Sequence, residues 1–223
     1  MIRRGGIGAG LVALGLLAGA SLTWGAVKAL RPTPGYRASG DLMLRAEEAA
    51  LFVRGVDPYI DPDMTYPPSA PAVFTPLVAP FGAGMLRVVW FGLNLAALGA
   101  ACGLIFHLAG SAWSREGRLA FGLVAAASKP VRLTLGIGQF SLLPLALALG
   151  SLAAARRGRP VVAGVAMGVA LVKPTVAAPF LVLLAELGAW RAVLGAVAFQ
   201  GAAVAVVAAW LGVDPIRLFG EWA

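Results

Sequence analysis

Long apolar runs dominate this chain of 223 residues, of which 60% are hydrophobic and 13% are charged. A mean hydropathy of +0.85 and several runs of about 18 or more residues are typical of polytopic membrane proteins. Only helices and closed barrels satisfy every backbone group inside hydrocarbon. The Leu, Ala, Gly and Val runs lack the alternation of barrel strands. The fold class is therefore all-α, a polytopic membrane helical bundle.

The apolar pattern predicts about seven membrane segments, at 7–30, 85–109, 117–135, 139–155, 160–172, 174–188 and 190–211. The first follows a basic Arg3-Arg4 pair, so a cleavable signal peptide is the rival interpretation. Its apolar stretch is longer than a typical signal core, and we expect a retained helix. No strong internal repeat or low-complexity linker is visible, which favours a single membrane domain over residues 1–223.

Basic residues predict the orientation. The compact basic turn at 156–160 should be cytoplasmic, and counting back from it makes the N-terminus cytoplasmic too. Residues 31–84 then form a large first extracytoplasmic loop. This holds only if Pro68–Phe81 does not cross: at 1.5 Å per residue it covers roughly 21 Å, less than the ~30 Å core. We expect a juxtamembrane or re-entrant helix there, since a crossing would invert every later side.

The net charge of +8 is explained by arginines in membrane-flanking loops, and we expect no nucleic-acid partner. The lone Cys102 cannot form an internal disulfide. His107, the one histidine, has no Cys or His cluster near it in the sequence, and we interpret it as an interfacial side chain. No zinc, P-loop or nucleophile-elbow pattern appears.

The first loop carries a polar island at 31–70 that holds six of the ten acids: Asp41, Glu47, Glu48, Asp57, Asp61 and Asp63. We expect a helix over 42–54. If it includes residue 41, one stripe holds Asp41, Arg45 and Glu48, and another holds Leu42, Ala46, Ala49 and Val53. This pattern predicts an amphipathic helix that lies on the outer membrane surface.

Asp41 has two possible roles. After Ser39-Gly40 it can cap the start of the helix, and spacing alone favours this role. A carboxylate at the membrane boundary can also act as a general base, because it can take a proton from a hydroxyl nucleophile. The sequence leaves both roles open.

Two turns follow the loop helix, Gly55-Val56-Asp57-Pro58-Tyr59 and Asp61-Pro62-Asp63. Their acids could bind a divalent cation through oxygen atoms. The spacing matches no calcium loop, so we interpret them as solvated turn carboxylates and expect neither a metal nor a cofactor. Tyr66-Pro67-Pro68 then stiffens the return into the membrane.

Two polar residues interrupt the later apolar segments. Gln139, after Gly136-Ile137-Gly138, could hydrogen-bond a sugar or phosphate, or mediate a helix–helix contact. Lys173 precedes Pro174 between two short segments, and a lysine at a bilayer centre costs about 2.5–3.5 kcal/mol. Contact with a lipid phosphate and structural snorkelling both explain it.

The order of these motifs resembles that of polyprenyl-phosphate-dependent membrane glycosyltransferases of the C-type superfamily. It is most similar to glycosyltransferase family 87, which includes mannosyltransferases. The motifs are Asp41 after the first segment, Gly55-x-Asp57-Pro58-Tyr59, Tyr66-Pro67-Pro68, Gly138-Gln139, and Ala163-Gly164 followed by Lys173-Pro174.

The resemblance implies transfer of a hexose or pentose from a polyprenyl-phosphate sugar to a hydroxyl acceptor. The reaction would take place at the outer face of the cytoplasmic membrane, with Asp41 as the general base. The substrate-binding residues that it implies are Lys173, Gln139, Tyr59, Tyr66 and Asp57. Family members are usually much longer, so the chain resembles the N-terminal half of the family fold, and a partner chain could complete the bundle.

The alternative hypothesis is a non-catalytic membrane protein, or an inactive fragment, that binds lipid phosphate or assembles with a partner. A transporter is a weaker hypothesis, because the spans hold few acids and no clear inverted repeat is visible. Membrane lipids and a lipid-linked sugar are the expected partners.

Overall fold

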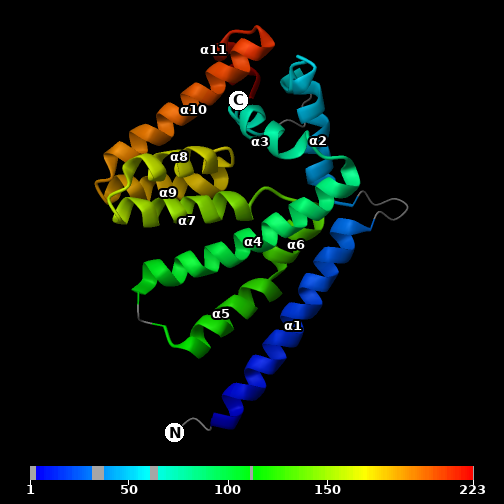
Figure 1. Ribbon diagram of the computed structural model, residues 1–223, viewed down its shortest axis with the longest axis vertical. Coiled ribbons are helices and arrows are strands. Elements are labelled where there is room, and N and C mark those ends of the chain that lie inside the picture. The colour runs from blue at the N-terminus through cyan, green and yellow to red at the C-terminus, as the bar shows by residue number, and fades with distance from the viewer. Residues whose placement is uncertain (1–3, 32–37, 61–64, 111–112, 223) are drawn as a thin grey trace.

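Helices make up the regular structure in the parts of the chain that the computed structural model describes, residues 4–31, 38–60, 65–110 and 113–222 (Figure 1). Three of these helices are long and apolar enough to cross a membrane: α1 (Arg4–Leu30), α4 (Ala83–Ala109) and α10 (Trp190–Leu211). The all-α class and the membrane-embedded character are confirmed.

The expected single segment at 117–135 corresponds to two helices. α5 (Arg115–Ala127) and α6 (Lys129–Ile137) meet at an angle of 51°. The break lies at Ser128, whose backbone is extended. The Ser128 hydroxyl caps the start of α6 by accepting a hydrogen bond from the Val131 N–H. Serine at the N-cap and Pro130 in the first turn are ordinary start signals for a helix.

Three further expected segments correspond to short helices, α7 (Leu142–Arg156), α8 (Pro160–Ala170) and α9 (Pro174–Glu186). Each is shorter than a helix that spans a membrane by itself. The described residues thus hold three candidate spans, or four if α5 and α6 count as one. The prediction of about seven membrane segments is not confirmed.

A close crossing holds α8 against α10. Gly164 and Gly168 lie one turn apart on α8, and small residues at this spacing let two helix backbones approach. A Cβ atom on Gly168 would lie 2.6 Å from the Cβ of Phe199 on α10. Beside this crossing, the Gln200 side chain donates to the Gly168 carbonyl at 2.6 Å and accepts from the Ser69 hydroxyl at 2.5 Å. The crossing therefore also ties the first loop to the bundle.

The first loop folds into α2 (Gly40–Val53), the 3-10 turn η1 (Pro58–Ile60) and α3 (Ala70–Val78). α2 and α3 pack on each other at the upper right of Figure 1. Arg45 and Glu48 are buried, whereas Val53 is exposed. The polar stripe of α2 is therefore covered by the rest of the protein at Arg45 and Glu48. The short helix expected within Pro68–Phe81 corresponds to α3.

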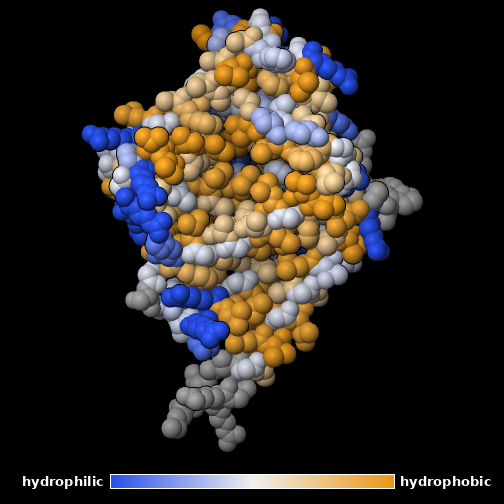
Figure 2. Space-filling model, in the orientation of Figure 1, coloured by the Kyte–Doolittle hydropathy of each residue, from blue (hydrophilic) through white to orange (hydrophobic). Residues whose placement is uncertain are grey.

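Basic side chains gather where α7 ends and α8 begins. Arg156 donates to the Leu108 carbonyl of α4 at 3.0 Å. The Arg157 Nη2 atom lies 3.1 Å from Nε2 of His107, which is also in α4. The α9–α10 connection and the start of α10 share a pocket with Ala155, Gly158 and Pro160 at this edge. Figure 2 shows hydrophilic patches at the edges of a broad apolar face, a distribution typical of membrane-embedded proteins.

Gly168→Ala should destabilise the protein, because the new methyl group overlaps the Phe199 side chain near its root. Overpacking of this kind costs about 1–3 kcal/mol. Thermal unfolding in detergent measures the loss. Gly103→Ala is the matched control, since a Cβ atom there meets nothing within 4 Å. Equal melting temperatures for the two variants would contradict the close crossing.

Candidate functional site

A pocket of about 300 Å³ brings together four of the residues that the sequence singles out. Its lining consists of Asp41, Thr65, Tyr66, Pro67, Gln139, Val172, Lys173, Pro174 and Thr175. These residues come from the start of α2, the chain before α3, the end of α6 and the α8–α9 connection. A carboxylate, an amide and an ammonium group thus share one pocket, although they are far apart in the sequence.

Asp41 lies in the first turn of α2, but it does not cap the helix. Ser39 occupies the N-cap position in a left-handed backbone conformation. The Ser39 hydroxyl donates to the Ala29 carbonyl near the end of α1 at 2.9 Å, so α2 starts directly against α1. The capping role for Asp41 is therefore wrong, and the carboxylate lines the pocket instead.

Gln139 is held beside α2 by its neighbour Gly138. Gly138 ends α6 with a φ of 74°, and a Cβ atom there would lie 2.6 Å from the Cβ of Leu42 on α2. The Trp90 indole N–H of α4 donates to the Gly138 carbonyl at 3.0 Å. Glycine is required here both for its positive φ and for the close approach of α2.

Lys173 forms the N-cap of α9, and Pro174 takes the first helical position. The Lys173 ammonium nitrogen lies 5.7 Å from the centre of the Tyr66 ring, which also lines the pocket. Burial lowers the pKa of Lys173, and the nearby Asp41 carboxylate opposes that change. Lys173 therefore faces the polar pocket rather than reaching away from it.

Burial raises the pKa of Asp41, and the positive charges of Arg45 and Lys173 partly offset this effect. A carboxylate loses hydration in the pocket, whereas nearby cations favour its charged form. The result is a carboxylate that accepts a proton more readily than one in water. This property suits a general base.

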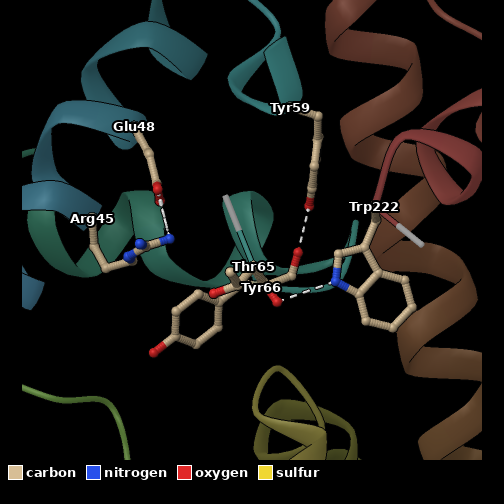
Figure 3. Close-up of polar contacts among 6 residues, drawn as sticks. All are labelled: Arg45, Glu48, Tyr59, Thr65, Tyr66 and Trp222. Atoms are coloured by element: carbon tan, nitrogen blue, oxygen red, sulfur yellow. Dashed lines mark hydrogen bonds and ion pairs between the residues drawn. The ribbon is translucent and has the colours of Figure 1, made fainter. Parts of the chain in front are cut away.

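Hydrogen bonds to two backbone carbonyls hold the Thr65–Tyr66 wall of the pocket (Figure 3). The Tyr59 hydroxyl donates to the Tyr66 carbonyl at 3.1 Å, and the Trp222 indole donates to the Thr65 carbonyl at 3.2 Å. Trp222 belongs to α11 (Pro215–Trp222). The C-terminal helix therefore supports a wall built by the first loop.

Tyr59 and Asp57 do not line the pocket, although the resemblance implies that they bind substrate. Tyr59 is buried, and burial raises the pKa of its phenol. An Asp57 carboxylate oxygen accepts a hydrogen bond from the Tyr59 backbone N–H at 2.9 Å, which fixes the turn. Tyr59 contacts the backbone of Tyr66, and Asp57 fixes the turn that carries Tyr59. Asp61 and Asp63 lie outside the described residues.

Sequence reasoning missed the two threonines of the pocket and the buried pair of Arg45 and Glu48 beside it. The pair shows in the sequence as opposite charges three residues apart on a helix, but nothing local indicates burial. No three His, Cys, Asp or Glu side chains cluster closely enough to hold a metal ion within the described ranges.

The sequence model of glycosyltransferase family 87 matches residues 64–223. The chain belongs to glycosyltransferase family 87. The match includes Tyr66, Gln139 and Lys173, and it begins after Asp41. Membership in family 87 implies a membrane glycosyltransferase with a lipid-linked sugar donor. No curated protein and no solved structure matches the chain.

Gly138→Ala should destabilise this family 87 protein far more than Gly158→Ala. Both glycines have similar positive φ values, 74° and 68°. An alanine in this left-handed conformation should lower the free energy of unfolding of each variant by about 1–2 kcal/mol. Only at Gly138 does the methyl group also meet the Cβ of Leu42, which adds about 1–3 kcal/mol. Unfolding in detergent compares the two. Equal losses would show that α6 does not touch α2 here.

Proposed function

We propose that this protein transfers a sugar from a polyprenyl-phosphate donor to a hydroxyl acceptor, with Asp41 as the general base. The observation that carries the proposal is the pocket shared by Asp41, Gln139 and Lys173 in a chain of glycosyltransferase family 87. The three groups supply what such a transfer needs: a proton acceptor, a sugar-binding amide and a cation for the leaving phosphate.

In the proposed reaction the acceptor hydroxyl oxygen attacks the anomeric carbon of the donor sugar. A new carbon–oxygen bond forms while the bond from that carbon to the phosphate oxygen breaks. The lipid phosphate leaves with the electron pair, and the hydroxyl proton passes to the Asp41 carboxylate. Attack opposite the leaving group inverts the anomeric configuration. The raised pKa of Asp41 brings its basicity closer to that of a working catalytic base.

Lys173 suits the phosphate end of the donor. Its ammonium group is a compact positive charge, and the start of α9 beside it carries the positive end of a helix dipole. Thr175 adds a hydroxyl group to the same wall. Charge that develops on the departing phosphate would therefore be stabilised as the bond breaks.

Gln139 suits the sugar, because a side-chain amide both donates and accepts hydrogen bonds, as sugar hydroxyls do. Tyr66 offers part of an aromatic ring as a wall. Tyr59 and Asp57 support this wall through the contacts described above. In this arrangement Asp41 and Lys173 act on opposite sides of the breaking bond.

The orientation follows from the two ends of the bundle. The basic turn at 156–160 lies at the end of α7 opposite Gln139, and α1 runs from the N-terminal side towards Ser39 beside the pocket. The positive-inside rule then supports an orientation with the basic turn and the N-terminus in the cytoplasm. In that orientation the pocket faces the outer side of the cytoplasmic membrane.

Asp41→Asn should lower sugar transfer by roughly 10²–10⁴-fold, the contribution of a general base. The assay incubates membranes containing the protein with radiolabelled polyprenyl-phosphate hexoses and pentoses and follows label in acceptors. Glu47→Gln is the control, because it makes the same acid-to-amide change at an exposed position on α2. Full transfer by Asp41→Asn would exclude Asp41 as the base.

Lys173→Met should weaken binding of polyprenyl phosphate to the purified protein by roughly 10–100-fold, since a charge-assisted hydrogen bond contributes about 1.5–3 kcal/mol. Binding of uncharged polyprenol should not change. Lys173→Arg should keep part of the affinity, and Lys129→Met, at an exposed lysine of α6, should keep all of it. Equal loss for both lipids would mean that Lys173 does not contact the phosphate.

A second candidate is a membrane protein that binds lipid phosphate without transferring sugar. The Lys173 end of the pocket supports this function without any contribution from Asp41, and the family match begins after Asp41. The two assays separate the candidates. Binding that depends on Lys173, with no transfer from any donor, would favour the second.

A further inference from the structure

An ion pair is buried in the middle of α2, one helical turn from Asp41. The residues Arg45 and Glu48 are only 3% and 6% exposed, and an Arg45 guanidinium nitrogen lies 2.6 Å from the Glu48 carboxylate. Removing two such charges from water costs several kcal/mol per ion, and apolar residues of similar volume often stabilise as well or better. Stability alone is therefore a weak reason for this pair.

The pair touches the wall of the pocket. The Arg45 guanidinium carbon lies 4.8 Å from the centre of the Tyr66 ring, and the Lys173 ammonium approaches the same ring. An aromatic face attracts cations, most strongly where water is excluded. Figure 3 shows Arg45 and Glu48 on α2 beside the segment that carries Tyr66. Arg45 thus links α2, which carries Asp41, to the opposite wall.

We propose that Arg45 is a positioning residue of the transferase site, which holds the Tyr66 ring against the pocket and places a positive charge one helical turn from Asp41. Glu48 orients the guanidinium group by accepting its hydrogen bond at 2.6 Å. This role rests on the proposed function, because it requires Asp41 to act as the base. Arg45 itself does not line the pocket and does not contact substrate.

The electrostatic part of this role follows from the groups around Asp41. They are Arg45 on α2, Lys173 before α9 and Tyr66 from the loop. Glu48, Asp57 and Arg45 act on Tyr59, and Glu48 also acts on Tyr66. Burial raises the pKa of Asp41, and the charge of Arg45 opposes this more than that of Lys173. Removing Arg45 should raise this pKa further. A smaller fraction of the base would then be ionised at any given pH.

Loss of the Arg45 charge should change the pH dependence of kcat/KM in a definite direction. A general base works in its ionised form, so kcat/KM rises as the pH passes upward through the pKa of Asp41. Loss of the Arg45 charge should move this acidic limb of the profile to higher pH. A purely structural role would lower the amount of folded enzyme without moving the limb.

A double variant separates the two roles. Arg45→Met with Glu48→Leu removes both charges but keeps side-chain volume, so the folded state should be retained. Arg45→Met alone leaves a buried carboxylate without its arginine and should lose stability. Activity that remains low in a stable double variant therefore reports on the site and not on folding.

The experiment measures kcat, KM and the pH profile of label transfer, together with thermal unfolding. It compares wild type, Arg45→Lys and the double variant. We expect the double variant to unfold near the wild-type temperature, with kcat reduced by roughly 10–100-fold. Its acidic limb should still move upward, because the lost charge of Arg45 acts on Asp41 more strongly than the lost charge of Glu48. Arg45→Lys should leave the acidic limb near its wild-type position, because it keeps the positive charge. Arg54→Met, which removes an exposed arginine at the end of α2, is the control and should match wild type.

An acidic limb and kcat unchanged in the folded double variant would overturn the role of Arg45 and leave the proposed function intact. Transfer that does not depend on Asp41, tested by Asp41→Asn in the same assay, would overturn both. The two failures are thus distinguishable.

Discussion

The close approach of Gly138 to the start of α2 is the constraint on which the site depends. Because this residue has no Cβ atom, the end of α6 can rest against Leu42 while the Trp90 indole binds the Gly138 carbonyl. This contact places Gln139 beside the first turn of α2 and therefore beside Asp41. Any side chain at Gly138 would push the carboxylate away from the amide.

Residues from the second half of the chain form or support the rest of the pocket. Pro174 begins α9 directly after Lys173, and the Lys173 ammonium group lies near enough to Asp41 for their charges to interact. Trp222 of α11 holds the Thr65 carbonyl, and Tyr59 holds that of Tyr66. The polar groups of the pocket thus lie at helix ends and on a loop that hydrogen bonds hold in place. Such placement lets a membrane protein keep charged groups at a site without burying them among lipid chains.

Much of the fold could be predicted because only helices and closed barrels satisfy the backbone polar groups inside hydrocarbon. The long runs gave α1, α4 and α10 nearly at their observed bounds. The bend between α5 and α6 was missed because average hydropathy hides a local break, although Ser128 and Pro130 signal a helix start. The meeting of Asp41, Gln139 and Lys173 was expected from the order of family motifs, not from spacing. Spacing alone favours a helix-capping role for Asp41.

Other features depend on tertiary packing and have no local signal. Arg45 and Glu48 look like a solvated stripe until α3 and Tyr66 cover them. Likewise, the turn that contains Asp57 and Tyr59 cannot reveal which way its side chains face. Burial by a distant segment of the chain decides these cases.

The most direct test of the central claim is photo-crosslinking with a polyprenyl phosphate that carries a diazirine next to its phosphate. Mass spectrometry then identifies the labelled peptides. If the phosphate binds at the junction of α2, α6 and α9, label should appear in residues 65–67 and 172–175, and Lys173→Met should reduce it. Label concentrated at the basic edge around 156–160 and 188–192 would contradict a phosphate site in this pocket.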